Sequence, residues 1–133
     1  GPAYDPQRPR HPKKKKSVKK STLRNKADRL FSLLIRSPGH CARCGSVAGL
    51  QCSHFISRRY LAVRFNPLNA ECLCIKCHKA FTGNPLKAKV WAEERRGIDV
   101  LNEPRRLALA GGAPDYRAVI AGLETSLKAL EAS

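Results

Sequence analysis

The chain has 133 residues, enough for one domain with tails, and its net charge is +16 because it contains 26 Lys and Arg residues and only 10 Asp and Glu residues. This excess of positive charge predicts that the protein binds a polyanion, and nucleic acid is the first candidate. Charge alone does not indicate a fold. The sequence contains no apolar signal segment or membrane span, so we expect a protein of the reducing cytoplasm whose cysteines bind metal rather than form disulfides.

Residues 1–20 contain four prolines and a run of four lysines, Lys13, Lys14, Lys15 and Lys16. This segment cannot bury a core, so we expect a disordered basic tail that contacts DNA phosphates without sequence preference. The alternative is a tail that is only solvated. The chain begins with Gly1-Pro2 and has no methionine, which indicates a protease-cleavage scar, and we expect the natural protein to begin further upstream.

Apolar residues at helical spacing predict a first helix from Thr22 to Arg36, which Pro38-Gly39 ends. Its apolar face is expected to pack on the cysteine-containing, metal-binding domain that follows.

Two Cys-x-x-Cys pairs, separated by 29 residues, come next. Four thiolates at this spacing predict a closed tetrahedral Zn²⁺ site, whereas a redox dithiol would need only one pair. The expected ligands are Cys41, Cys44, Cys74 and Cys77. Cys52 and Cys72 lie outside the pairs and are interpreted as small buried residues, with a second metal role left open.

Short apolar segments at Leu50–Ile56 and Tyr60–Phe65 are predicted to pair as a β-ribbon, with a turn at Asn66-Pro67. From Cys74 onward the pattern predicts a short helix that carries His78 and Lys79.

The C-terminal part is predicted to be helical. Asn84-Pro85 begins a helix that ends at Gly97, and Pro104 begins a short helix that Gly111-Gly112 ends. Pro114 begins the last helix. Its apolar seam is predicted to pack into the core, with a homodimer interface as the alternative, and consists of Tyr116, Val119, Ile120, Leu123, Leu127 and Leu130.

Three residues between and beside the cysteine pairs suggest chemistry. A phosphodiester hydrolase needs a base for water, a cation for the leaving oxygen and a group that orients the base. His54, a metal bound by His78, and Asn69 could supply them in that order. The alternative is that His54 is a structural histidine near the zinc.

The order His54, Asn69, His78, with His78 directly after the second cysteine pair, resembles the HNH (ββα-metal) nuclease motif. Over residues 22–110 the chain resembles more specifically the phage NinG/Rap recombination-nuclease family. The residues that carry this closer resemblance are Gln51-Cys-Ser-His-Phe-Ile-Ser-Arg58, Arg64-Phe65, Asn69 and Thr82-Gly83-Asn84.

This resemblance implies an α+β fold, in which a small ββα-metal core held together by zinc is flanked by N- and C-terminal helices. The nuclease domain would span residues 21–112, followed by an amphipathic helix in 113–133. The implied activity is metal-dependent cleavage of branched DNA, such as Holliday junctions, during phage recombination in the bacterial cytoplasm. On the HNH pattern His54 is the general base, Asn69 holds its loop, and His78 binds catalytic Mg²⁺ or Mn²⁺.

One position departs from the pattern. Many HNH nucleases have a metal-binding Asp or His immediately before the base, and here that residue is Ser53. The only nearby acid is Glu71, so the cation would be completed by DNA phosphate and water, as Mg²⁺ tolerates. His54 could also be a metal ligand itself.

Arg58, Arg59 and Arg64 surround the expected base in the sequence. At least one is expected to contact DNA phosphate, with a solvated basic face as the alternative. Two other functions remain open: an HNH nuclease that nicks or cuts duplex DNA without branch preference, and a zinc-dependent DNA-binding module without catalysis, which Ser53 favours.

Overall fold

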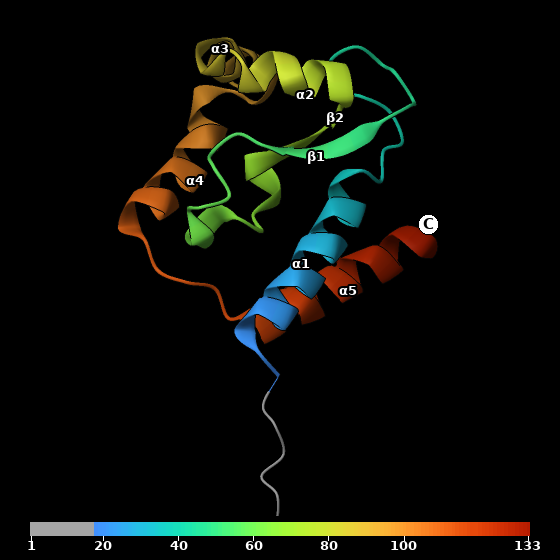
Figure 1. Cartoon of the computed structure of the whole chain (residues 1–133), viewed down its shortest axis with the longest axis vertical. Coiled ribbons are helices and arrows are strands. Elements are labelled where there is room, and N and C mark those ends of the chain that lie inside the picture. Colours follow the sequence, from blue (N-terminus) through green and yellow to red (C-terminus); the bar gives the residue numbers. More distant parts are fainter. Residues whose placement is uncertain (1–17) are drawn as a thin grey trace, which may run out of the picture.

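The computed structural model describes residues 18–133, so the lysine run at Lys13–Lys16 and most of the predicted tail lie outside the described residues. The described part is an α+β fold with five α-helices and one two-stranded sheet (Figure 1). In chain order the elements are α1 (Lys20–Ile35), β1 (Leu50–His54), the 3-10 helices η1 (Leu61–Val63) and η2 (Pro67–Asn69), β2 (Ala70–Cys74), α2 (Ile75–Thr82), α3 (Pro85–Arg96), α4 (Ile98–Ala110) and α5 (Tyr116–Glu131). None of the described helices has the length and apolar character needed to cross a membrane.

The two strands β1 and β2 run antiparallel, with Cys52 opposite Cys72 at the centre. The prediction that Tyr60–Phe65 is the partner strand is wrong, because this segment contains η1 instead. All five residues of β2 are buried, so the strand lacks the apolar–polar alternation by which a half-buried strand is found in a sequence.

Helices cover both faces of this small sheet (Figure 1). On one face α1 contacts both strands, and Phe31 packs near Ala70. On the other face α2 contacts both strands, and Leu73 packs with Phe81. The chain order of the central unit is therefore strand, strand, helix, with α2 beginning directly after β2.

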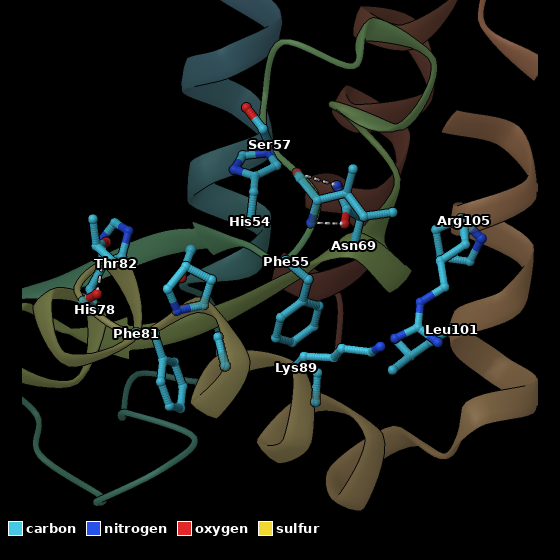
Figure 2. A pocket seen from close by; sticks show the side chains of 16 residues that line it. His54, Phe55, Ser57, Asn69, His78, Phe81, Thr82, Lys89, Leu101 and Arg105 are labelled. Carbon is cyan, nitrogen blue, oxygen red and sulfur yellow. Dashed lines mark hydrogen bonds between the residues drawn. The ribbon is translucent and has the colours of Figure 1, made fainter. Parts of the chain in front are cut away.

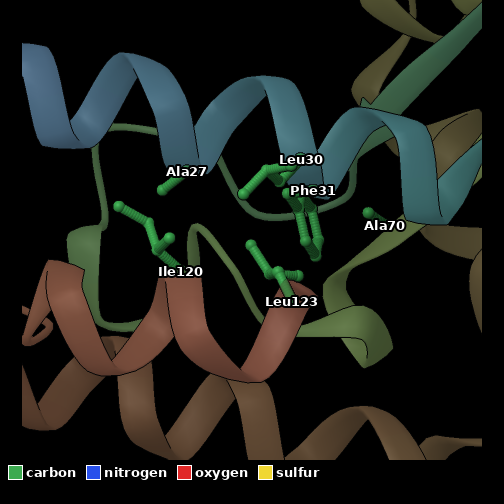
Figure 3. Packing of buried hydrophobic residues seen from close by; sticks show 6 residues of the cluster. All are labelled: Ala27, Leu30, Phe31, Ala70, Ile120 and Leu123. Atoms are coloured by element: carbon green, nitrogen blue, oxygen red, sulfur yellow. The ribbon is translucent and has the colours of Figure 1, made fainter. Parts of the chain in front are cut away.

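The last helix, α5, packs along α1, and together they form the larger hydrophobic cluster (Figure 3). Ile120 and Leu123 of the predicted seam are buried against Ala27, Leu30 and Phe31 of α1. Most of the seam therefore packs into the core of this chain, as predicted, whereas Leu130 near its end is exposed.

The helices after α2 follow the capping signals only in part, since α5 begins at Tyr116 with Asp115 as its cap rather than at Pro114. The side chain of Asn84 caps α3 by accepting a hydrogen bond from the Lys87 N–H at 3.1 Å. The prediction that Pro104 begins a helix is wrong, because α4 begins at Ile98 and Pro104 lies inside it. Gly97, with a φ of 86°, turns the chain between α3 and α4 in a conformation that favours glycine.

Candidate functional site

The first cysteine pair lies on a tight turn before β1. The Gly45 N–H donates to the Cys41 carbonyl at 2.9 Å, and Gly45 has a φ of 81°, a left-handed conformation that glycine adopts without strain. The second pair lies where β2 becomes α2. There the Cys74 sulfur accepts a hydrogen bond from the Cys77 N–H at 3.5 Å, so this cysteine also caps the helix.

The four cysteines converge on one point. Their sulfur atoms lie within 4.8 Å of one another, and those of Cys44 and Cys74 are 3.6 Å apart. Four sulfurs at about 2.3 Å from a zinc ion would be about 3.8 Å from one another in a tetrahedron. Arg43 adds a positive charge that favours thiolates, with its guanidinium 3.7 Å from the Cys77 sulfur. The cluster can therefore hold a structural zinc ion.

Cys52 and Cys72 are separate from this cluster. They lie opposite each other in the sheet, on the face that α1 covers. Burial is the main cause that raises the pKa of the Cys52 thiol to about 12, so it remains protonated at neutral pH. The two residues fit the prediction of small packed side chains better than a role as metal thiolates.

His54 lies at the end of β1 and is held from two sides. Its ring packs against the ring of Phe31 with centroids 5.5 Å apart, and Nε2 lies 2.8 Å from the backbone carbonyl of Arg64. A carbonyl only accepts, so Nε2 carries the proton and Nδ1 keeps a free lone pair. Burial is the main cause that lowers the pKa of His54 below its ordinary value of 6.5. The ring is therefore neutral at pH 7 and can accept a proton.

Asn69 connects β2 to the loop that follows His54, and its side chain is buried. Its Oδ1 accepts from the Ile56 N–H at 2.8 Å, and its Nδ2 donates to the carbonyls of Ile56 and Val63, each at 3.1 Å. One amide thus ties both ends of the 56–63 loop to the sheet. Arg64 directly follows this loop. The Asn69 amide therefore also helps to fix the Arg64 carbonyl, to which His54 is hydrogen-bonded.

His78 lies in the first half of α2, directly after the zinc cluster. Its Nδ1 is 2.5 Å from Oε1 of Gln51 on β1. Nδ1 donates this bond, which leaves Nε2 without a proton and able to bind a metal. Metal-binding histidines commonly donate their second ring nitrogen to an oxygen in this way.

The two histidines line one cavity of about 400 Å³, together with Ser53 and Asn69 (Figure 2). Lys89 of α3 and Arg105 of α4 also line it, although sequence reasoning did not single them out. They reach the cavity because α3 packs on α2 and α4 packs on η1 and η2. The positions of Lys89 and Arg105 in the sequence contain no signal for this packing.

No Asp or Glu is among the residues that line this cavity in the described part of the chain. Glu71 lies opposite Ser53 in the sheet, but its carboxylate pairs with Arg95 and Arg96 of α3. It therefore joins β2 to α3 and does not replace the carboxylate that the HNH pattern has at the Ser53 position.

A second, more polar hollow of about 260 Å³ lies on the other side of His54, between α1 and β1. Asp28, Arg36 and Arg58 line it. Burial by itself would raise the pKa of Asp28, but the hydrogen bond from Arg64 and the charges of Arg58 and Arg64 together outweigh it and lower that pKa. This carboxylate is ionised and already paired, so the hollow has no free acid to offer a cation.

The arginines expected at the DNA differ in their surroundings. Arg64 binds Asp28 through two hydrogen bonds of 2.8 and 2.7 Å, and only 14% of its side chain is exposed. Arg58 also pairs with Asp28, at 3.0 Å, but about half of its side chain is exposed. Arg59 and Lys79 are exposed. The structure thus gives Arg64 an internal partner and leaves the other three accessible.

The chain matches no family model, no curated protein and no solved structure.

Proposed function

We propose that this protein is a metal-dependent DNA endonuclease of the HNH type, with branched DNA as its substrate and phage recombination as its setting. The observation that carries the proposal is the orientation of His54. Its Nε2 is fixed by the Arg64 carbonyl, and the ring borders a cavity that His78 also borders.

In this proposal His54 is the general base. Its Nδ1 takes a proton from water, and the water oxygen forms a bond to phosphorus. The ester bond between phosphorus and the leaving oxygen breaks, and that oxygen then gains a proton from solvent. A base with a lowered pKa is in its neutral, accepting form at pH 7, and a base of this kind contributes roughly 10²- to 10⁴-fold to a rate.

His78 is the proposed protein ligand of a catalytic Mg²⁺ or Mn²⁺. Its bond to Gln51 leaves Nε2 available, and the other ligands would be phosphate oxygens and water. Such an ion, when bound, would stabilise the charge that develops on the leaving oxygen.

Basic side chains that follow the two histidines in the chain or line the cavity would position the DNA backbone. Arg58 and Arg59 follow His54, Lys79 follows His78, and Lys89 and Arg105 border the cavity itself. Guanidinium and ammonium groups give binding that depends on phosphate rather than on base sequence. The lysines at Lys13–Lys16 would add to this attraction.

Two alternatives have specific support. The lack of a carboxylate among the described cavity residues favours a zinc-stabilised DNA-binding module without catalysis. The exposed basic side chains alone would equally suit an HNH nuclease that cuts duplex DNA without branch preference.

A plasmid-nicking assay with added Mg²⁺ or Mn²⁺, compared with chelator, separates an enzyme from a binding module. The chelator concentration must leave the zinc in place, which a native mass spectrum of the treated protein checks. Cleavage only with the added metal supports a nuclease, and binding without cleavage under all conditions supports the module. A four-way junction and a linear duplex of the same sequence then distinguish the two nucleases.

A further inference from the structure

The cavity that contains the two histidines extends well beyond them. In the view of Figure 2, His54 and His78 lie on one side, Lys89 and Arg105 lie on the other, and Phe55 lies between. The hydrolysis of a phosphodiester uses only the histidine end. The remainder of the volume is available to another part of the substrate.

This remaining part is lined mainly by apolar side chains from three helices and the loop after β1. They include Phe55, Phe81 of α2, Ala88 of α3, and Leu101 and Pro104 of α4. Phe81, Leu101 and Pro104 are buried. Packing of α3 against α2, and of α4 against α3 and the 3-10 helices η1 and η2, thus encloses a preformed hollow.

The two aromatic rings are also held in place. The Phe81 ring lies 5.2 Å from the Trp91 ring, and the guanidinium of Arg96 lies 5.7 Å from the Phe55 ring. At the far side, Arg105 donates a 2.8 Å bond to Glu93 through one nitrogen and keeps a third of its side chain exposed. Lys89 is exposed beside it. The hollow therefore combines apolar and aromatic walls with cations near its opening.

A hollow of this kind does not suit the outside of a DNA duplex, which offers phosphates and sugars. It suits a nucleobase, because bases stack on aromatic side chains and the adjacent phosphates pair with cations. The whole cavity, histidine end included, measures about 400 Å³, within the range of roughly 300–1,000 Å³ typical of small-molecule sites. A base is available for such a site where it has no partner, as in the single-stranded arm of a forked DNA.

We infer that this hollow receives an unpaired nucleobase of the DNA strand being cut, next to the scissile phosphate, and that this contact makes branched DNA the preferred substrate. The inference rests on the proposed nuclease function for the position of the phosphate. The binding of the base itself can be tested without cleavage.

The test measures affinity by fluorescence anisotropy for a labelled forked DNA, with zinc-loaded protein and no added divalent metal. Each of the first three unpaired nucleotides at the fork is replaced in turn by an abasic site. In the parent protein one replacement should weaken binding roughly 5- to 150-fold, which corresponds to the loss of one base–aromatic stack.

Ala88→Phe should fill the hollow and remove this difference, so that intact and abasic forks bind equally. Ala88→Leu adds less volume and gives the same comparison if the larger side chain prevents folding. Ala129→Phe, on the exposed outer face of α5, is the matched control and should keep the parent's difference. Zinc content and the thermal midpoint of each variant report its folding.

Equal binding of intact and abasic forks by the parent would overturn the inference, as would a difference that persists in the folded Ala88 variants. If the difference disappears only in the Ala88 variants but no DNA is cleaved with any metal, base binding stands and the nuclease proposal fails. If DNA is cleaved but the base makes no difference to affinity, the nuclease proposal stands and this inference fails.

Discussion

The backbone carbonyl of Arg64 lies 2.8 Å from Nε2 of His54, while the guanidinium of the same arginine binds Asp28 on α1. One residue thus orients the proposed base through its main chain and anchors the loop through its side chain. The half-buried ion pair with α1 connects the first helix of the chain to the geometry of the site.

Arg64→Lys is expected to slow DNA cleavage by roughly tenfold at saturating DNA, while affinity for DNA changes little. Lysine keeps the charge but loses the two-pronged contact with Asp28, so the loop and the carbonyl that hold His54 lose their anchor. Single-turnover rates and affinities measured on the same DNA check this. Weaker binding with an unchanged rate would instead make Arg64 a phosphate contact, as the sequence first suggested. Arg59→Lys is the control at an exposed position.

The rate of cleavage is expected to fall on the acid side, with a midpoint below pH 6.5. Burial lowers the pKa of His54, so the base stays neutral until the pH falls below this ordinary value. The unfolded chain binds this proton more readily than the folded chain does. The free energy of unfolding should therefore also fall, and the protein become less stable, as the pH drops below 6.5. Both effects should be absent in His54→Ala, as the pH profiles of rate and thermal midpoint would reveal. A rate midpoint above 6.5 would contradict the assignment.

Asn69→Ala is expected to destabilise the protein by about 2–4 kcal/mol, because it leaves buried backbone groups of the 56–63 loop without partners. Cleavage should fall as well, since the loop carries the partner of His54. Chemical denaturation measures the first effect and single-turnover cleavage the second. Asn66→Ala removes one exposed hydrogen bond, to the Leu68 N–H, and should cost less than about 1 kcal/mol.

Cys77→Ser is expected to abolish zinc binding and unfold residues 40–84, because metal binding supplies on the order of 10 kcal/mol of folding free energy in small zinc sites. Native mass spectrometry should find one Zn²⁺ in the parent chain and none in the variant. Cys52→Ala, outside the cluster, should keep the zinc. A disulfide between the two cysteine pairs of the purified parent would be incompatible with this account.

Several elements could be predicted from the sequence because their signals are local. The spacing of Cys41, Cys44, Cys74 and Cys77 alone predicts that their sulfurs meet. Asn84 followed by Pro85 predicts the start of α3, since capping depends on neighbouring residues.

Other elements depend on contacts that no local pattern contains. β2 is buried on both faces, so its sequence lacks the alternation of apolar and polar residues by which a strand is usually found. The apolar Tyr60–Phe65 segment is therefore predicted as the partner strand instead. Pro104 occurs inside α4, where its missing N–H usually disfavours a helix, and its ring packs into the cavity wall.

The candidate site was predictable only in part, for the same reason. The order of His54, Asn69 and His78 suggested a shared role, and all three border one cavity. The Arg64 carbonyl could not be predicted, because every residue has a backbone carbonyl and only the fold determines which one reaches His54. Lys89 and Arg105 line the cavity because of how α3 and α4 pack. This packing also could not be predicted from the positions of the two residues in the sequence.

The central claim, that His54 is the base of metal-dependent DNA cleavage, is tested most directly by the single-turnover nicking rate of His54→Ala at saturating plasmid with added Mg²⁺ or Mn²⁺. We predict a rate lower by roughly a hundredfold or more, with zinc content and DNA affinity equal to those of the parent protein. A folded, zinc-loaded His54→Ala that nicks DNA at the parent rate would contradict the claim.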